Sequence, residues 1–295
     1  MRTKLETLDL LKHELHQHVR GQSEALNRLW EEVDMRESGT IPQHGPRACY
    51  FFAGPTGVGK TKSAEILAKT LVGPECFLRI DCSEYKTLES LTLLLGDQTG
   101  NRGRLGRAHD AAPEAVWLWD EIEKAHPELV QLFLQMADKG RLTLACGETL
   151  DLSGTYLILT SNLGSAEIIG REHLPFTSLE RHVVGAIEKF LRPELLARFG
   201  KPFVFRPLGR EIQAEIAEHR LAQLLAWHQT EGRTLEEGPE VLAFMIYRGF
   251  SRRLGARPLV NFIEQSVGSA VRNNQRAGGT GSGRLTVVDN LLTLV

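Results

Sequence analysis

The feature that most constrains this chain is residues 49–61, CYFFAGPTGVGKT, where an apolar run leads into a glycine-rich loop. The pattern G-x-x-x-x-G-K-[ST] is met in full by Gly54, Gly59, Lys60 and Thr61. Residues 50–53 have the composition of a buried strand, and residues 62–72 that of a helix, which is the context this loop requires. The segment therefore predicts a phosphate-binding loop between the first strand and first helix of a parallel α/β sheet.

The chemistry expected of this loop follows from its residue types. Glycines let successive backbone N–H groups point inward at phosphates, and the helix N-terminus adds its dipole. Lys60 is expected to reach the β and γ phosphates, and the Thr61 hydroxyl to ligate Mg²⁺. We therefore assign a nucleoside triphosphate to the loop residues Pro55, Thr56, Gly57, Val58, Gly59, Lys60 and Thr61.

Short apolar runs recur along the first two thirds of the chain, separated by helical or loop stretches. They span residues 50–53, 77–80, 115–119, 156–160 and 203–205. Nearly unbroken apolar strands alternating with helices are typical of a parallel sheet covered by helices on both faces. The pattern predicts a three-layer α/β domain.

The character of the sequence changes after Pro207. Helical periodicity dominates residues 210–227, 239–248 and 257–275, and a strand-like run follows at 285–288. At the other end, residues 1–33 have the pattern of two helices joined by a turn at 19–22, and residues 35–47 that of a loop. We predict a large α/β nucleotide-binding domain over residues 1–206 and a small, mainly helical domain over residues 207–295.

Bulk composition is that of an ordinary globular protein, with 42% hydrophobic and 24% charged residues and a formal charge of −2. This near-neutral charge does not select a partner. Four cysteines without a C-x-x-C pair predict free thiols in a reducing compartment. No apolar run approaches a membrane span and the N-terminus lacks a signal-peptide core, so we expect a cytoplasmic protein with no membrane partner.

Two carboxylates follow the apolar run VWLW, at Asp120 and Glu121. Beside a phosphate loop, the first acid of such a pair holds Mg²⁺ and the second polarises the attacking water. A third apolar run ends in Asn162, where an amide could orient that water at the sheet edge that collects ligands. Arg198 and Arg257 are candidates for neutralising charge near the γ-phosphate.

Taken together, these segments carry a family resemblance. GPTGVGKT, RIDCSEY, WDEIEKAHPEL, FLQMADKGRLT, TSNLGS, RPELLARF, VFRPL and GARPL follow one another in this order. In this order they resemble the AAA+ module of the Clp heat-shock unfoldases, specifically the second ATPase ring. The resemblance runs from about Leu8 to the C-terminus, which leads us to expect a stand-alone module.

The resemblance implies roles for particular residues. The adenine pocket would be lined by Val19, Arg20, Gly21 and Gln22. Asn162 would be sensor 1, Arg257 sensor 2 within the subunit, and Arg198 the finger presented to a neighbouring subunit. A finger acting in trans implies a homo-oligomeric ring, usually of six subunits, with ATP and Mg²⁺ bound at the interfaces.

One segment departs from the family. Where those unfoldases carry a Gly-Tyr-Val-Gly pore loop, this chain has Gly-Asn-Arg-Gly at residues 100–103, in a shortened interval. The aromatic grip is replaced by a cationic run of Arg102, Arg104 and Arg107, with no acid before Asp110. Such a run suits phosphates or acidic peptides, or is a solvated loop. A second departure is Arg171 after Ile169 and Gly170, in place of an apolar peptidase-docking residue, so coupling to a peptidase is not expected.

Three functional hypotheses follow. The first is an ATP-hydrolysing, chaperone-like ring that remodels a protein or protein assembly through an atypical, non-aromatic pore loop. The second is a nucleotide-switched module that binds or loads onto nucleic acid through the cationic run, with affinity falling steeply with salt. The third is a scaffold that binds ATP for assembly, which the intact Asp120–Glu121 pair disfavours.

Overall fold

A computed structural model describes residues 3–171 and 173–295, and the chain divides into two compact units. The first comprises residues 1–55 and 59–206, and the second residues 56–58 and 207–295. Each unit has its own hydrophobic core. Among the described residues, no helix is both long and apolar enough to span a bilayer.

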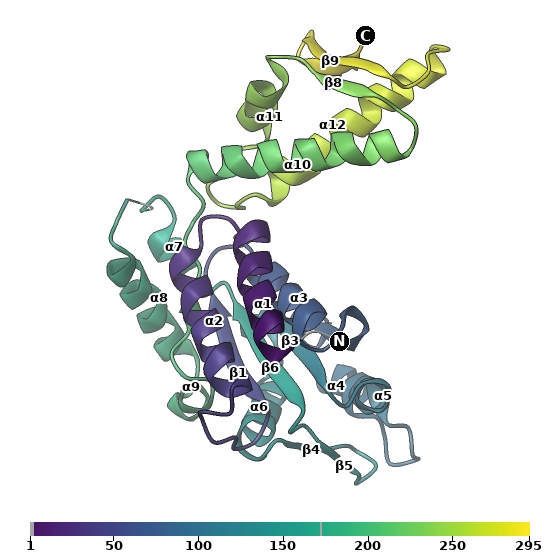
Figure 1. Ribbon diagram of the computed structural model, residues 1–295. Coiled ribbons are helices and arrows are strands. Elements are labelled where there is room, and N and C mark those ends of the chain that lie inside the picture. Colours follow the sequence, from purple (N-terminus) through teal and green to yellow (C-terminus); the bar gives the residue numbers. More distant parts are fainter. Residues whose placement is uncertain (1–2, 172) are drawn as a thin grey trace. The chain divides into compact units, whose positions relative to one another are not determined.

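The first unit is built on a five-stranded parallel sheet with the order β2-β3-β6-β1-β7. Its strands are β1 (Ala48–Ala53), β2 (Phe77–Asp81), β3 (Ala115–Asp120), β6 (Thr155–Ser161) and β7 (Phe203–Val204). The central strands β3, β6 and β1 are almost wholly buried, because helices cover both faces. The predicted α/β parallel-sheet architecture is confirmed (Figure 1).

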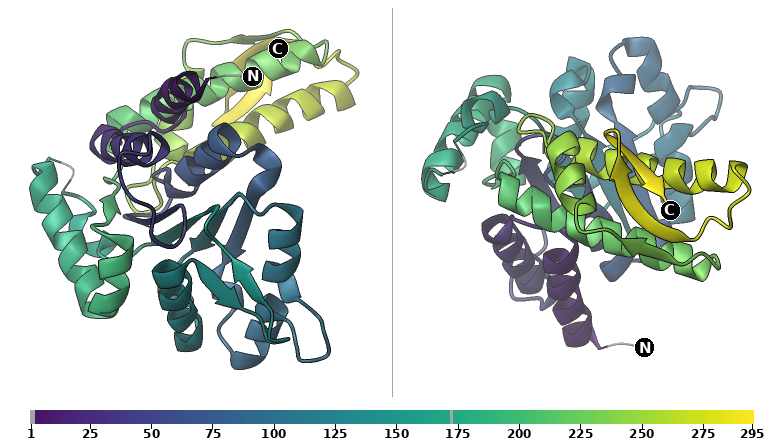
Figure 2. Two further views of the ribbon diagram at one scale, coloured as in Figure 1. Left: turned by 60° about the horizontal axis from the view of Figure 1, so that its bottom comes forward. Right: turned by 90° about the horizontal axis from the view of Figure 1, so that it is seen from above.

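Alternation along the strands divides the core between two faces of this sheet. Phe51, Trp117 and Leu157 point to one face, where they pack with buried residues of the helices between residues 88 and 199. Their neighbours Tyr50 and Tyr156 are equally buried on the opposite face. Figures 1 and 2 show α1 (Lys4–His18), α2 (Ser23–Glu37) and α3 (Lys60–Leu71) on that side of the sheet. The sheet therefore forms the middle of three layers.

Helices of very different length surround this sheet. In chain order they are α1 (Lys4–His18), α2 (Ser23–Glu37), α3 (Lys60–Leu71), α4 (Leu88–Leu95), α5 (Gly103–Ala111), α6 (Pro127–Lys139), α7 (Ser165–Ile168), α8 (Phe176–Phe190) and α9 (Pro193–Phe199). Short 3-10 turns lie at Pro74–Cys76, Cys82–Glu84 and Ile122–Lys124. Helix α2 extends to Glu37, so the expected loop at 35–47 begins three residues late.

Local signals in the sequence explain where α6 begins and ends. The His126 side chain accepts a hydrogen bond from the Glu128 N–H, and Pro127 occupies the first turn, where a missing N–H costs nothing. Gly140 ends the helix with φ near +60°, a conformation that glycine adopts without strain. A hairpin of β4 (Arg141–Thr143) and β5 (Thr149–Asp151) follows, which the sequence pattern did not predict.

The second unit is a helical domain with a small sheet. Its helices are α10 (Arg210–Thr230), α11 (Val241–Gly249) and α12 (Arg257–Arg276). Strands β8 (Leu235–Glu237), β9 (Gly283–Val288) and β10 (Leu291–Leu294) form a sheet of order β10-β9-β8 that packs on these helices (Figure 2). Only one of these strands was expected from the sequence, so the domain is less purely helical than predicted.

Candidate functional site

The glycine-rich loop leaves the carboxyl end of β1 and enters α3, and two of its glycines are required by geometry. Gly59 has φ near +110°, and a Cβ placed there would lie 2.5 Å from Val19 Cγ1. Gly54 has φ near +140°, and its Cβ would lie 2.3 Å from the Phe205 carbonyl oxygen. A side chain at either position meets both strain and collision. The motif glycines therefore keep the loop tight against its neighbours.

Lys60, the first residue of α3, is buried and lies across the loop. Its Nζ donates to the carbonyl oxygens of Gly54 and Pro55 at 2.6 and 2.8 Å, and to Asn162 Oδ1 at 2.9 Å. The bond to Asn162 joins α3 to the segment that follows β6. Residues that are 102 positions apart are thus brought together at the carboxyl edge of the sheet.

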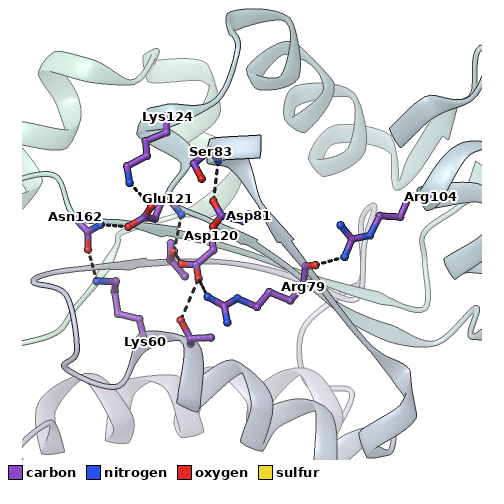
Figure 3. A network of polar contacts seen from close by, with 11 residues as sticks. Lys60, Arg79, Asp81, Ser83, Arg104, Asp120, Glu121, Lys124 and Asn162 are labelled. Carbon is purple, nitrogen blue, oxygen red and sulfur yellow. Dashed lines mark hydrogen bonds and ion pairs between the residues drawn. The ribbon is translucent and has the colours of Figure 1, made fainter. Parts of the chain in front are cut away.

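Asp120 ends β3 beside this lysine, and its two carboxylate oxygens have different partners (Figure 3). The Thr160 hydroxyl donates to Oδ1. Oδ2 accepts from Arg79 Nη2 at 2.7 Å and from the Thr61 hydroxyl at 3.4 Å. Thr61 and Asp120, the two predicted Mg²⁺ ligands, are therefore adjacent. Hydroxyl and carboxylate oxygens are donors that suit Mg²⁺ when a nucleotide supplies further oxygens.

Glu121, the predicted base, adopts a left-handed backbone conformation with φ 58° and ψ 54°. Its Oε1 accepts from Asn162 Nδ2 at 3.0 Å, and Lys124 donates to Oε2. The hydrogen bond from Lys124 to Glu121 also raises the pKa of the lysine. Strained backbone of this kind persists only where its surroundings hold it, and it is typical of functional sites. Asn162 thus contacts both Lys60 and Glu121.

The predicted adenine-pocket segment forms the turn between α1 and α2. Val19 is buried against Gly59, and Gly21 turns the chain with φ near +72°. The Gln22 side chain, 1% exposed, makes two hydrogen bonds to the backbone of Arg206, accepting at 2.7 Å and donating at 3.0 Å. Gln22 thereby ties this turn to the end of the first unit, and Arg20 lies half-buried beside it.

The two predicted arginines belong to other elements of the chain. Arg198, on α9, is half-exposed and pairs with Asp138 of α6 at 2.8 Å. Arg257 is the first residue of α12, in the second unit. Their roles at a nucleotide remain predictions.

The segment that departs from the family is a compact loop between α4 and α5. Asp97 Oδ1 accepts from the N–H and hydroxyl of Thr99, at 2.8 and 2.5 Å, and the Asn101 carbonyl accepts from the Asp97 N–H at 3.0 Å. Gly96 and Gly103 bring the two ends so close that a Cβ on Gly96 would lie 1.7 Å from the Asn101 carbonyl oxygen. The loop is therefore internally bonded.

The cationic run on this loop is engaged within the chain. Arg102 pairs with Asp110 and, at 2.6 Å, with Glu148 in the β4–β5 connection. Arg104 donates to the Arg79 carbonyl at 2.7 Å and to the Tyr85 hydroxyl at 3.2 Å. The surface is less cationic than expected from sequence, because Glu148 approaches from a segment 46 residues away.

With this geometry in place, comparison with known families is informative. Residues 46–201 match the model described as AAA domain (Cdc48 subfamily), and residues 208–277 match the C-terminal, D2-small domain of ClpB protein.

The chain belongs to the AAA domain family, Cdc48 subfamily. Its curated relatives include chaperone protein ClpB of Meiothermus ruber, 36% identical over 291 residues, covering 96% of this chain and 34% of the relative. Heat shock protein 100 of Trypanosoma brucei brucei is 34% identical over 273 residues, covering 90% and 32%. This AAA chain spans about a third of the length of these relatives. The predicted resemblance to a second ATPase module of Clp type is confirmed.

Solved structures of Hsp104 are also similar to this chain. A closed-state reconstruction of Hsp104 with ATPyS and FITC casein is 29% identical, with a TM-score of 0.86 over 100% of this chain and 52% of the other. The S. cerevisiae Hsp104:casein complex in an extended conformation gives a TM-score of 0.87 at 29% identity, over 100% and 53%. The likeness to these Hsp104 structures therefore extends over the whole chain.

Three contacts of this AAA site were not anticipated from the sequence. Arg79 binds Asp120, Thr160 orients it, and Lys124 binds Glu121. Lys124 could have been found, because it lies three residues after Glu121 on the same turn. Arg79 and Thr160 reach Asp120 from neighbouring strands, and the spacing of residues along the chain does not predict which strands are neighbours.

Proposed function

We propose that this chain hydrolyses ATP and works as a homo-oligomeric ring that remodels proteins or protein assemblies. The observation that carries the proposal is the cluster in which Asn162 bridges Lys60 and Glu121 beside the Thr61–Asp120 pair. This cluster combines a phosphate-binding cation, a magnesium-type donor pair and a carboxylate base. These are the parts that phosphoryl transfer to water needs.

The nucleotide phosphates would lie on residues 54–61, with the N–H groups at the start of α3 and Lys60 Nζ as donors. Mg²⁺, held by Thr61 and Asp120, would neutralise charge on the β and γ phosphates. Glu121 would accept a proton from the attacking water, and Asn162 would fix the position of that carboxylate through its 3.0 Å bond. The adenine would lie against the Val19–Gln22 turn.

Arg198 would serve a neighbouring subunit. It is half-exposed and its partner Asp138 is also exposed, so exchanging this ion pair for a phosphate costs little. Arg257 would approach the nucleotide of its own subunit. An assembly of identical subunits, six by family resemblance, completes each site. Cytoplasmic location remains a prediction.

Protein, rather than nucleic acid, is the substrate class we propose. The solved relatives named above are Hsp104 complexes that contain casein, and the curated relatives are named as chaperone or heat shock proteins. Nucleic acid is not proposed, because Arg102 and Arg104, two of the three arginines that suggested it, are engaged within the chain. The α4–α5 loop would then meet the polypeptide without an aromatic side chain.

The test is steady-state ATP hydrolysis with buffer, unfolded casein, single-stranded DNA or double-stranded DNA. We expect casein alone to raise the rate. Glu121→Gln should keep nucleotide affinity and lower turnover by about 10²-fold or more, because it removes the base. Glu128→Gln, on the exposed start of α6, should leave the rate unchanged. Full turnover in Glu121→Gln would remove the base assignment, and stimulation by DNA alone would replace the substrate class.

A further inference from the structure

Arg79 belongs to this cluster of contacts but has no place in the scheme above. It lies on β2, two residues before Asp81, so period-two alternation puts both side chains on the same face of the sheet. Its guanidinium reaches across to Asp120 Oδ2 on β3 at 2.7 Å. The Arg79 side chain is 47% exposed and that of Asp120 only 11%. Solvent can therefore receive the arginine if it leaves the carboxylate.

The oxygen that Arg79 occupies is the one a metal ion would use. Thr160 holds Oδ1 of Asp120, which leaves Oδ2 facing the Thr61 hydroxyl at 3.4 Å. Thr61 and Arg79 therefore share Oδ2 (Figure 3). Because Thr160 already orients the carboxylate, the arginine is not needed for that task. Its position makes it a competitor for the metal-binding oxygen.

A second carboxylate explains why a cation is held here. Asp81 and Asp120 are register partners on adjacent parallel strands, which lie about 4.8 Å apart. Two neighbouring carboxylates repel each other, and a nearby positive charge offsets that repulsion. Lys124 and Arg79 both supply positive charge near Asp81, and Arg79 is the one that contacts Asp120.

From these contacts we propose that Arg79 is a counter-ion latch, bound to Asp120 until Mg²⁺ arrives with the nucleotide and displaces it toward Asp81. The inference rests on the proposed nucleotide site and adds a positioning residue to it. Only the side chain of Arg79 moves, because its backbone is held in place. Arg104 of α5 donates a hydrogen bond to the Arg79 carbonyl at 2.7 Å and another to the Tyr85 hydroxyl at 3.2 Å.

The test measures binding rather than turnover. Fluorescent N-methylanthraniloyl-ADP is titrated with the full chain in EDTA and at a series of MgCl₂ concentrations. Arg79→Gln should lower the MgCl₂ concentration that gives half of the affinity gain by about threefold, the size expected for loss of a partly exposed ion pair. Affinity in EDTA should stay within about twofold of the parent chain. Arg79→Lys, which keeps a cation, should remain close to the parent.

Control variants distinguish a failure of the proposal for Arg79 from a failure of the proposed nucleotide site. Arg181→Gln, an exposed arginine on α8, should leave the MgCl₂ dependence unchanged. Asp120→Asn should abolish the MgCl₂ effect. If the parent chain binds no nucleotide, the proposed function fails. If it binds and Arg79→Gln leaves the MgCl₂ requirement unchanged or raises it, the latch is overturned while the site stands.

Discussion

At the scale of single residues, the site depends on a few positions with unusual backbone conformations. Gly59 combines a positive φ with a close approach to Val19, and Glu121 holds a left-handed backbone between two polar partners. Side chains such as Arg198, by contrast, are half-exposed and held by an ion pair at the surface. Gly59 and Glu121 fix the geometry of the site, whereas an exposed residue such as Arg198 can exchange its ion-pair partner at little cost in free energy.

Gly59→Ala is predicted to lower nucleotide affinity by at least about tenfold, because the new Cβ would strain the backbone at φ near +110° and push Val19 away. Labelled-nucleotide binding measures the effect. Gly185→Ala on α8 is the matched control, since a Cβ there meets nothing within 4 Å, and it should bind normally with slightly higher thermal stability. Normal binding by Gly59→Ala would show that the loop adapts.

At the scale of elements, apolar runs placed the five parallel strands to within about two residues at each end, because strands buried on both faces must be apolar throughout. The same signal fails for β4, β5 and β8, which are three residues long and have two exposed residues each. Helix α8 also went unpredicted. Its buried residues recur with ordinary helical periodicity, but no sequence motif marks where the helix begins or ends.

One source of pH dependence in the second unit is His228 on α10. His228 is 4% exposed, and its Nδ1 accepts from Arg233 Nε at 2.9 Å, which requires a neutral ring. Burial, together with the charge of Arg233, lowers the pKa of His228 below its usual 6.5. The unfolded chain therefore binds the proton more readily, so stability is complete above about pH 6.5 and falls as the pH drops below it.

Urea unfolding at pH 7.5 and 5.5 tests this prediction. The parent chain should unfold at lower urea at pH 5.5, and His228→Asn should show a smaller difference between the two pH values. His44→Asn, at an exposed position, should keep the parent's difference. Equal pH dependence in all three chains would rule His228 out as the source.

At the scale of the whole molecule, our proposal is that Arg198 of a neighbouring subunit completes each site. Arg198→Ala should lower ATP turnover by about 10³-fold or more if its guanidinium stabilises the transition state of a neighbour. Lys60→Ala should be inactive because it cannot hold the phosphates. Neither variant alone would report which subunit supplies the arginine.

Mixing the two variants distinguishes the arrangements. In equal mixtures, half of the subunits have an intact phosphate loop and half of their neighbours supply Arg198, so about a quarter of the sites should regain activity. Recovery of hydrolysis after mixing supports action in trans. No recovery at any ratio, while mixed oligomers form, would mean that the arginine acts within its own subunit.

The sequence by itself determined the parallel α/β architecture and the positions of Lys60, Thr61, Asp120, Glu121 and Asn162. These motifs are local, because a phosphate-binding loop or a strand that ends in carboxylates is formed by consecutive residues. Only the tertiary structure decided that Arg79 shares an oxygen with Thr61, that Gln22 binds the Arg206 backbone, and that Glu148 neutralises Arg102. These contacts join residues 41 to 184 positions apart, and the packing of distant segments brings them together, so the local spacing of residues does not predict them.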